Sequence, residues 1–133
     1  MLTEDDVVAA VCIELENRGW SIESRLLTTQ RGPDIQATKG QEKLLVEAKG
    51  EGSSKAHSSR YGMPFTRNQV RTHIGVAILT ALKVAARQQE LAGIALPDNA
   101  HHHEVLGDAK LPLLQTGVAI FWTSERTVQV EGL

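Results

Sequence analysis

Two acids and one lysine occupy positions from which they could share one site. Asp34 directly follows Pro33, and Glu47 and Lys49 lie in the run 43–49. Because side chains alternate along a strand, Glu47 and Lys49 should point to the same face. Asp34 starts the preceding strand of the same hairpin and should approach Glu47 across the pair. Two carboxylates that close repel each other unless a cation lies between them, and Mg²⁺ prefers such oxygen ligands.

This combination of groups predicts hydrolysis of phosphodiester bonds. A Mg²⁺ ion held by Asp34 and Glu47 would polarise a phosphodiester oxygen and lower the pKa of a bound water. Lys49 would orient that water or stabilise the negative charge that develops during the reaction. We therefore expect Mg²⁺ as the cofactor, with Mn²⁺ able to replace it.

Residues 52–89 form a basic block, although the formal net charge of the whole chain is −2. The block contains six Lys and Arg residues and neither Asp nor Glu. A local positive field attracts phosphates whatever the overall charge, so we expect DNA as the partner. The alternative is a helix that happens to be basic on its solvated side. The expected nucleic-acid contacts are Lys55, Arg60, Arg67, Arg71 and His73.

The pattern of apolar residues predicts one α/β domain over residues 1–133. With 41% hydrophobic and 23% charged residues, the chain has an ordinary globular composition, which argues against a disordered or fibrous protein. Helical spacing predicts helices at 4–17, 66–90 and 100–115, the last interrupted by Gly107 and Pro112. Short apolar runs predict strands at 20–28, 34–38, 43–49, 91–96, 117–122 and 127–130. This order predicts a mixed central sheet flanked by helices, with a long surface loop at 50–65.

The pair Pro33-Asp34, followed by Glu47-Ala48-Lys49 at the end of an apolar strand, resembles a known motif. It is similar to the Pro-Asp and Asp/Glu-x-Lys motif of the restriction-endonuclease-like, or PD-(D/E)XK, nuclease superfamily. The resemblance covers about residues 4–96 and implies an αβββαβ core, here followed by a helix and a strand pair. It also implies that the two acids bind Mg²⁺ together with the main-chain carbonyl of Ala48.

The resemblance implies two further site residues. Members of the superfamily often supply an acid from the first helix, where Glu4 projects into the apolar stripe and Glu14 lies at its edge. Glu4 is the preferred metal ligand, although an acid there could simply favour the helix dipole. Gln69 matches a glutamine that some branches use in catalysis. Alternatively, Gln69 only closes a capping box with Thr66 at the start of its helix.

The sequence therefore predicts a Mg²⁺-dependent DNA endonuclease. The alternative is the same fold kept as a DNA-binding or assembly module without turnover; two close acids, which repel phosphate, favour the enzyme. A site for a small phosphorylated molecule is weakened by the size of the basic block. The chain leaves little room for a separate recognition domain, so a homodimer or a partner protein is expected to supply specificity.

Other segments of the sequence carry weaker expectations. No apolar run approaches the roughly 20 residues that a membrane helix needs, and the first residues are acidic where a signal peptide would be basic. We therefore expect no membrane partner and a cytoplasmic location. The run His101-His102-His103 is expected to be a solvated helix start and not a metal site, because consecutive residues on a helix do not share a face.

Overall fold

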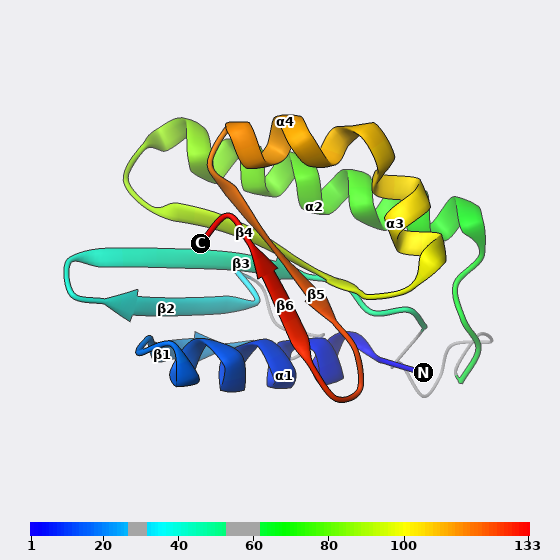
Figure 1. Ribbon diagram of the computed structural model, residues 1–133, viewed down its shortest axis with the longest axis horizontal. Coiled ribbons are helices and arrows are strands. Elements are labelled where there is room, and N and C mark those ends of the chain that lie inside the picture. Colours follow the sequence, from blue (N-terminus) through cyan, green and yellow to red (C-terminus); the bar gives the residue numbers. More distant parts are fainter. Residues whose placement is uncertain (27–31, 53–61) are drawn as a thin grey trace.

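The strands lie in the sheet in the same order as in the chain, as the computed structural model shows for residues 1–26, 32–52 and 62–133 (Figure 1). Strands β3, β4 and β5 run parallel, whereas the β1–β2, β2–β3 and β5–β6 pairs are antiparallel. The sheet is therefore mixed, and the predicted α/β class is confirmed. The strands are β1 (Ser21–Arg25), β2 (Ile35–Lys39), β3 (Glu42–Ala48), β4 (Leu91–Pro97), β5 (Val118–Thr123) and β6 (Val128–Glu131).

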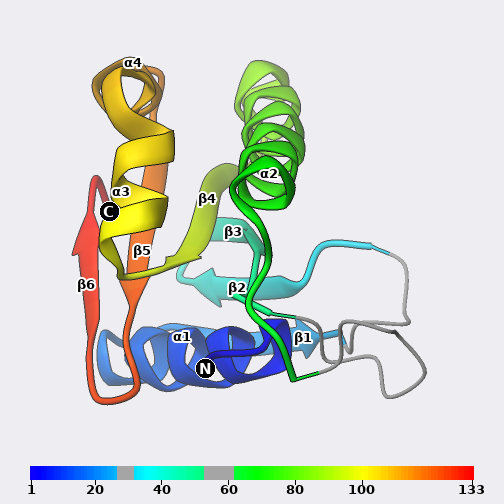
Figure 2. The ribbon, with the colours of Figure 1, turned by 90° about the vertical axis from the view of Figure 1, so that its right-hand side faces the viewer.

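Helices cover both faces of this sheet (Figure 2). The helices are α1 (Glu4–Asn17), α2 (Arg67–Arg87), α3 (Ala100–Leu106) and α4 (Lys110–Gln115), with a 3-10 turn at Gly107–Ala109. Helix α1 packs on one face, and the other three helices pack on the opposite face. Alternation along β3 decides which core each residue joins: Leu44 and Val46 pack with α1, whereas Leu45 packs with α2. Glu47, two residues after Leu45, lies on the same face as Leu45.

The predicted order of helices and strands is confirmed, with one difference in the third helix. Gly107 ends α3 as expected, with a positive φ of 46°. Pro112, in contrast, does not break the chain's helical path. It lies in the first turn of α4, where a backbone N–H has no partner within the helix, so the missing proline donor costs little. Within the predicted loop 50–65, residues 53–61 lie outside the described part.

The histidine run lies at the start of α3 as expected, but it is only partly solvated: His103 is exposed, whereas His102 is buried. His102 is only 3% exposed, because the side chain of Asn99 caps α3 and accepts hydrogen bonds from both the backbone N and Nδ1 of His102. Burial, followed by the nearby His101, lowers the pKa of His102 to about 4, so its ring is neutral at pH 7. His103 stacks on Trp122 with ring centroids 3.7 Å apart. Among the described residues, no helix is long and apolar enough to cross a bilayer.

Candidate active site

The β2–β3 hairpin brings Asp34 to Glu47. Its register pairs Ile35 with Val46, so Asp34, one residue earlier, lies opposite Glu47, one residue later. The carboxylate Oδ2 of Asp34 accepts a hydrogen bond of 2.7 Å from the backbone N of Ala48. This bond fixes the Asp34 side chain at the end of β3. The structure therefore places the two acids together, as their strand positions predict.

The two carboxyl groups disturb each other electrostatically. Burial, followed by the negative charge of Asp34, raises the pKa of Glu47 to about 7. Burial also raises the pKa of Asp34, against the opposing effects of the Ala48 N–H and the Lys49 ammonium. A raised pKa favours the protonated form of each carboxyl group. Near pH 7 the Glu47 carboxyl is therefore only partly ionised, and a bound cation would favour its ionised form.

Lys49 completes this cluster. Its Nζ lies 3.7 Å from Oε1 of Glu47, and the two side chains are only 17% and 18% exposed. The backbone N of Lys49 donates a hydrogen bond of 3.0 Å to the carbonyl of Ala95 in β4. The neighbouring parallel strand therefore positions the residue at the point where β3 ends.

The start of α1 wraps around the end of β3. Glu51 accepts a hydrogen bond of 2.6 Å from the N of Leu2 through Oε1, and its own N donates to the carbonyl of Leu2 at 2.8 Å. The backbone at Gly50, just after β3, passes so close to the start of α1 that a Cβ at this position would collide with the backbone of Glu4. Only glycine fits this crossing, and it brings the first turn of α1 to the paired acids.

Of the two candidate acids of α1, Glu4 acts on the paired acids: after burial and the charge of Asp34, its negative charge adds to the raised pKa of Glu47. Its role as a metal ligand stays a prediction. Glu14 forms an ion pair of 2.7 Å with Arg18 at the other end of the helix. Sequence reasoning missed Asp5, whose charge contributes to the raised pKa of Asp34. The acidic first turn of α1 was the available signal, but nothing in the sequence shows that this turn adjoins β3.

Gln69 takes part in a capping box at the start of α2. Its Oε1 accepts a hydrogen bond of 2.8 Å from the N of Thr66, and its own N donates to Oγ1 of Thr66 at 3.3 Å. The capping interpretation is therefore confirmed. A catalytic role for Gln69 stays a prediction.

The predicted phosphate contacts differ in their surroundings. Arg67 forms an exposed ion pair of 2.7 Å with Glu104 of α3, whereas Arg71 is exposed and has no ion-pair partner among the described residues. His73 packs edge-on against Phe65, and burial, followed by the charge of Lys49, lowers its pKa below the usual value. Its neutral form is therefore favoured. Two further candidates, Lys55 and Arg60, lie outside the described residues.

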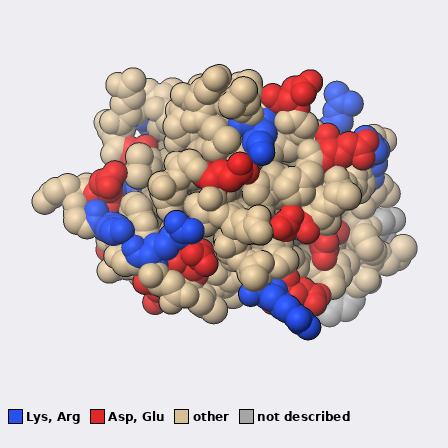
Figure 3. Space-filling model, in the orientation of Figure 1, with Lys and Arg blue, Asp and Glu red and all other residues tan. Residues whose placement is uncertain are grey.

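The visible charges on the face of Figure 1 are interspersed in sign (Figure 3). Acidic and basic side chains alternate there, and neither sign forms a continuous field in this view. The face shown in Figure 3 is therefore not positively charged as a whole.

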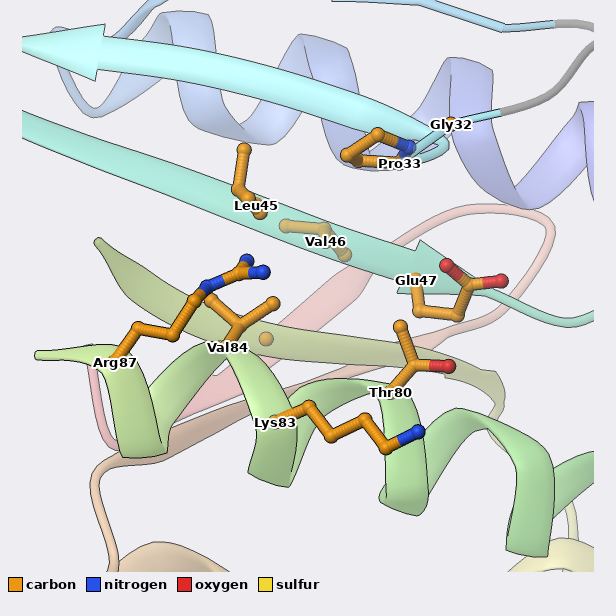
Figure 4. Close-up of a pocket in the computed structure, with 10 residues that line it drawn as sticks. Gly32, Pro33, Leu45, Val46, Glu47, Thr80, Lys83, Val84 and Arg87 are labelled. Atoms are coloured by element: carbon orange, nitrogen blue, oxygen red, sulfur yellow. The ribbon is translucent and has the colours of Figure 1, made fainter. Parts of the chain in front are cut away.

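A hollow between β3 and α2 adjoins Glu47 and contains two cations that sequence reasoning did not assign to the site. Its volume is about 250 Å³. Glu47 lies at one end, and Lys83 and Arg87 line the side formed by α2 (Figure 4). Thr80, Lys83 and Arg87 are spaced as i, i+3 and i+7, which places them on one helix face. That spacing was a signal in the sequence, although it does not say which strand the face covers.

The oxygen atoms of the cluster suit a small, hard cation. Continuing the β2–β3 register places Pro33 opposite Ala48. Because proline has no N–H, Pro33 cannot donate a hydrogen bond to the Ala48 carbonyl, and this leaves that oxygen available to a cation. Among the described residues, no group of three or more His, Cys, Asp and Glu side chains is arranged to hold a metal. Mg²⁺ does not require such a group, because it commonly takes one or two carboxylates and fills its other positions with water and substrate phosphate. The donor set thus fits Mg²⁺, and the ion itself stays a prediction.

No protein-family model matches the chain, and neither a curated protein nor a solved structure matches it. The function must therefore be argued from the geometry of the site.

Proposed function

We propose that the protein is a metal-dependent nuclease that hydrolyses DNA phosphodiester bonds at Asp34, Glu47 and Lys49, on a restriction-endonuclease-like core. One observation carries the proposal. Two partly buried carboxyl groups lie opposite each other on adjacent strands, the pKa of Glu47 is raised to about 7, and an ammonium lies 3.7 Å from Glu47. Strained acids of this kind are typical of sites that bind a cation or transfer a proton.

In the proposed mechanism the strand ends hold the reacting groups in place. Asp34 and Glu47, with the carbonyl of Ala48, would hold Mg²⁺, which supplies Lewis-acid activation of the phosphodiester and of a water. Lys49 reaches the same point and can hold the attacking water by a hydrogen bond or stabilise the charge on the phosphate oxygens. The hydrogen bond from the Ala48 N to Asp34 keeps that carboxylate aimed at the site.

DNA is the proposed substrate because cations flank the paired acids on one side. Lys83 and Arg87 line the hollow beside Glu47, whereas Arg71, nine residues before Thr80, is exposed on the opposite side of α2. Cations that flank an acidic centre offset its repulsion of phosphate and hold the backbone without reading sequence. The proposed nucleic-acid surface is therefore the side of α2 that borders β3.

The test is cleavage of supercoiled, linear, branched and single-stranded DNA, and of RNA, with Mg²⁺, Mn²⁺ or EDTA. The parent should cut one or more of the DNA forms only with metal. Glu47→Gln and Lys49→Ala should each lower the rate by about 100-fold or more, in the range seen when one group that stabilises the transition state is removed. Glu42→Gln and Lys43→Ala are matched controls, because they make the same changes at the other end of β3 and should keep the rate.

Two results would count against the proposal. Cleavage that survives both site variants, in a preparation free of contaminating nuclease, would place the chemistry elsewhere. Metal-independent DNA binding without cleavage of any substrate would favour the module without turnover, in which the same surface only holds DNA.

A further inference from the structure

The hollow between β3 and α2 has one charged side and one apolar side. Lys83 and Arg87 supply positive charge and Glu47 adds a carboxyl group at one end, while Leu45 and Val84 form an apolar surface between the strand and the helix (Figure 4). Pro33, just before β2, also lines the hollow. A ligand that fills this space needs an anionic group and a compact apolar or ring-shaped body.

The two cations are available to such a ligand. Lys83 is exposed and has no ion-pair partner among the described residues. The Nη2 atom of Arg87 lies 3.7 Å from Oε1 of Glu90, and its side chain is 55% exposed. This ion pair is long and open to water, so it would cost little to exchange for a phosphate.

The position of the hollow relates it to the proposed cleavage site. Glu47 belongs to both, and Leu45 lies two residues back along β3, which is about 6.6 Å. That is the length of about one nucleotide of extended backbone. A strand with its scissile phosphate at Glu47 would therefore place a neighbouring nucleotide in the hollow.

The size of the hollow limits what form that nucleotide can take. A space of about 250 Å³ accepts one nucleoside-sized group and excludes a base pair within a duplex. A nucleotide that enters it must be unpaired, either in a single strand or after leaving the stack.

We propose that this hollow binds one unpaired nucleotide of the cleaved strand, with its phosphate held by Lys83 and Arg87 and its sugar or base against Pro33, Leu45 and Val84. The inference rests on the proposed function only in assuming that the bound strand is the one that is cleaved. It adds a substrate class to that function. Single-stranded, flapped or branched DNA should therefore be preferred to continuous duplex.

The first experiment measures nucleotide binding alone, in EDTA, so that no cleavage is needed. Thymidine 5′-monophosphate is titrated into isotope-labelled protein, and backbone amide shifts are followed by NMR. Shifts should gather at Leu45, Thr80 and Val84. Thymidine and inorganic phosphate, titrated separately, should each bind about fivefold or more weakly than the nucleotide, because each fills only half of the hollow.

Variants then test the two cations. Lys83→Ala with Arg87→Ala should raise the dissociation constant for the nucleotide about fivefold or more, whereas Lys43→Ala with Arg126→Ala removes the same charge elsewhere and should leave it unchanged. Both positions of the first pair are exposed, so the fold should survive; a thermal melt checks this. If that pair does not fold, Lys83→Gln and Arg87→Gln are measured singly and should each weaken binding.

The results separate this inference from the proposed function. Equal binding of the nucleotide by the parent and by the Lys83 and Arg87 variants would overturn the inference. Equal binding of phosphate and nucleotide would also overturn it, because the hollow would then be an anion site only. Metal-dependent cleavage with no preference for unpaired DNA would overturn the inference and leave the proposed function standing. Nucleotide binding in the hollow without any cleavage would support the site and count against the nuclease.

Discussion

Replacing Glu47 by Gln should make the metal-free protein more stable at high pH but not at low pH. The pKa of Glu47 is raised from its ordinary value of 4.5 to about 7, so the folded protein holds this proton more tightly than the unfolded chain does. The stability linked to this group is complete below the unfolded pKa and is lost as pH rises through about 7. Glutamine keeps the shape of the protonated acid and cannot ionise, so the variant lacks this loss.

The size of the effect follows from the shift. At about 1.4 kcal/mol per unit of pKa, a rise from 4.5 to about 7 corresponds to at most roughly 3 kcal/mol. The side chain of Glu47 is 18% exposed, and water there screens part of the repulsion from Asp34. We therefore expect the variant to gain about 2 kcal/mol relative to the parent between about pH 5 and pH 8.5.

Urea unfolding in EDTA, repeated across that pH range, measures this difference. Glu42→Gln is the matched control, because Glu42 is an exposed acid at the other end of β3, and its difference from the parent should stay flat. The reasoning is wrong if the difference between the Glu47 variant and the parent stays constant within about 0.5 kcal/mol, the range of ordinary surface substitutions. Such a result would mean that Asp34 and Glu47 do not strain each other.

Further predictions concern two glycines and two arginines. Gly50→Ala should destabilise the protein by about 1–3 kcal/mol in urea unfolding, because its Cβ would collide with the backbone of Glu4. Gly75→Ala, on an exposed part of α2 with open space around the new Cβ, should instead stabilise it by about 0.5–1 kcal/mol. Arg71→Ala should weaken DNA binding and lower its salt slope by about one, whereas Arg67→Ala should change it less because Arg67 already pairs with Glu104. A salt slope unchanged by Arg71→Ala would limit the nucleic acid to the side of α2 that borders β3.

The paired acids could be predicted because the relevant information is local. Alternation along one strand places Glu47 beside Lys49, and a short hairpin brings Asp34 opposite. The capping box at Thr66 and Gln69 is local as well. Each of these features depends on a spacing of a few residues or on two adjacent strands, so it can be predicted from the sequence alone.

The features that were missed depend on contacts between distant segments. The charge of Asp5 acts on Asp34 because α1 crosses the end of β3 at Gly50, and Lys83 lines the hollow because α2 lies over that strand. The burial of His102 was missed for the same reason. Its neighbours are polar, and its burial depends on the cap that Asn99 forms and on the packing of α3 against α2.

Metal binding should depend on pH through the same proton. A cation needs both acids ionised, so below about pH 7 it must displace the proton that Glu47 holds. The affinity for Mn²⁺ should therefore rise up to about tenfold per pH unit below about pH 7 and level off above it. In a thermal melt, Mn²⁺ at about a hundred times its dissociation constant should stabilise the parent by about 2.7 kcal/mol. Asp34→Asn should lose most of this gain, while Glu14→Gln, far along α1, should keep it. If the gain is the same in Asp34→Asn, or does not change with pH, the cation does not bind between the acids. The module without turnover would then explain the protein better than the proposed nuclease, because the proposed hydrolysis needs a cation at these acids.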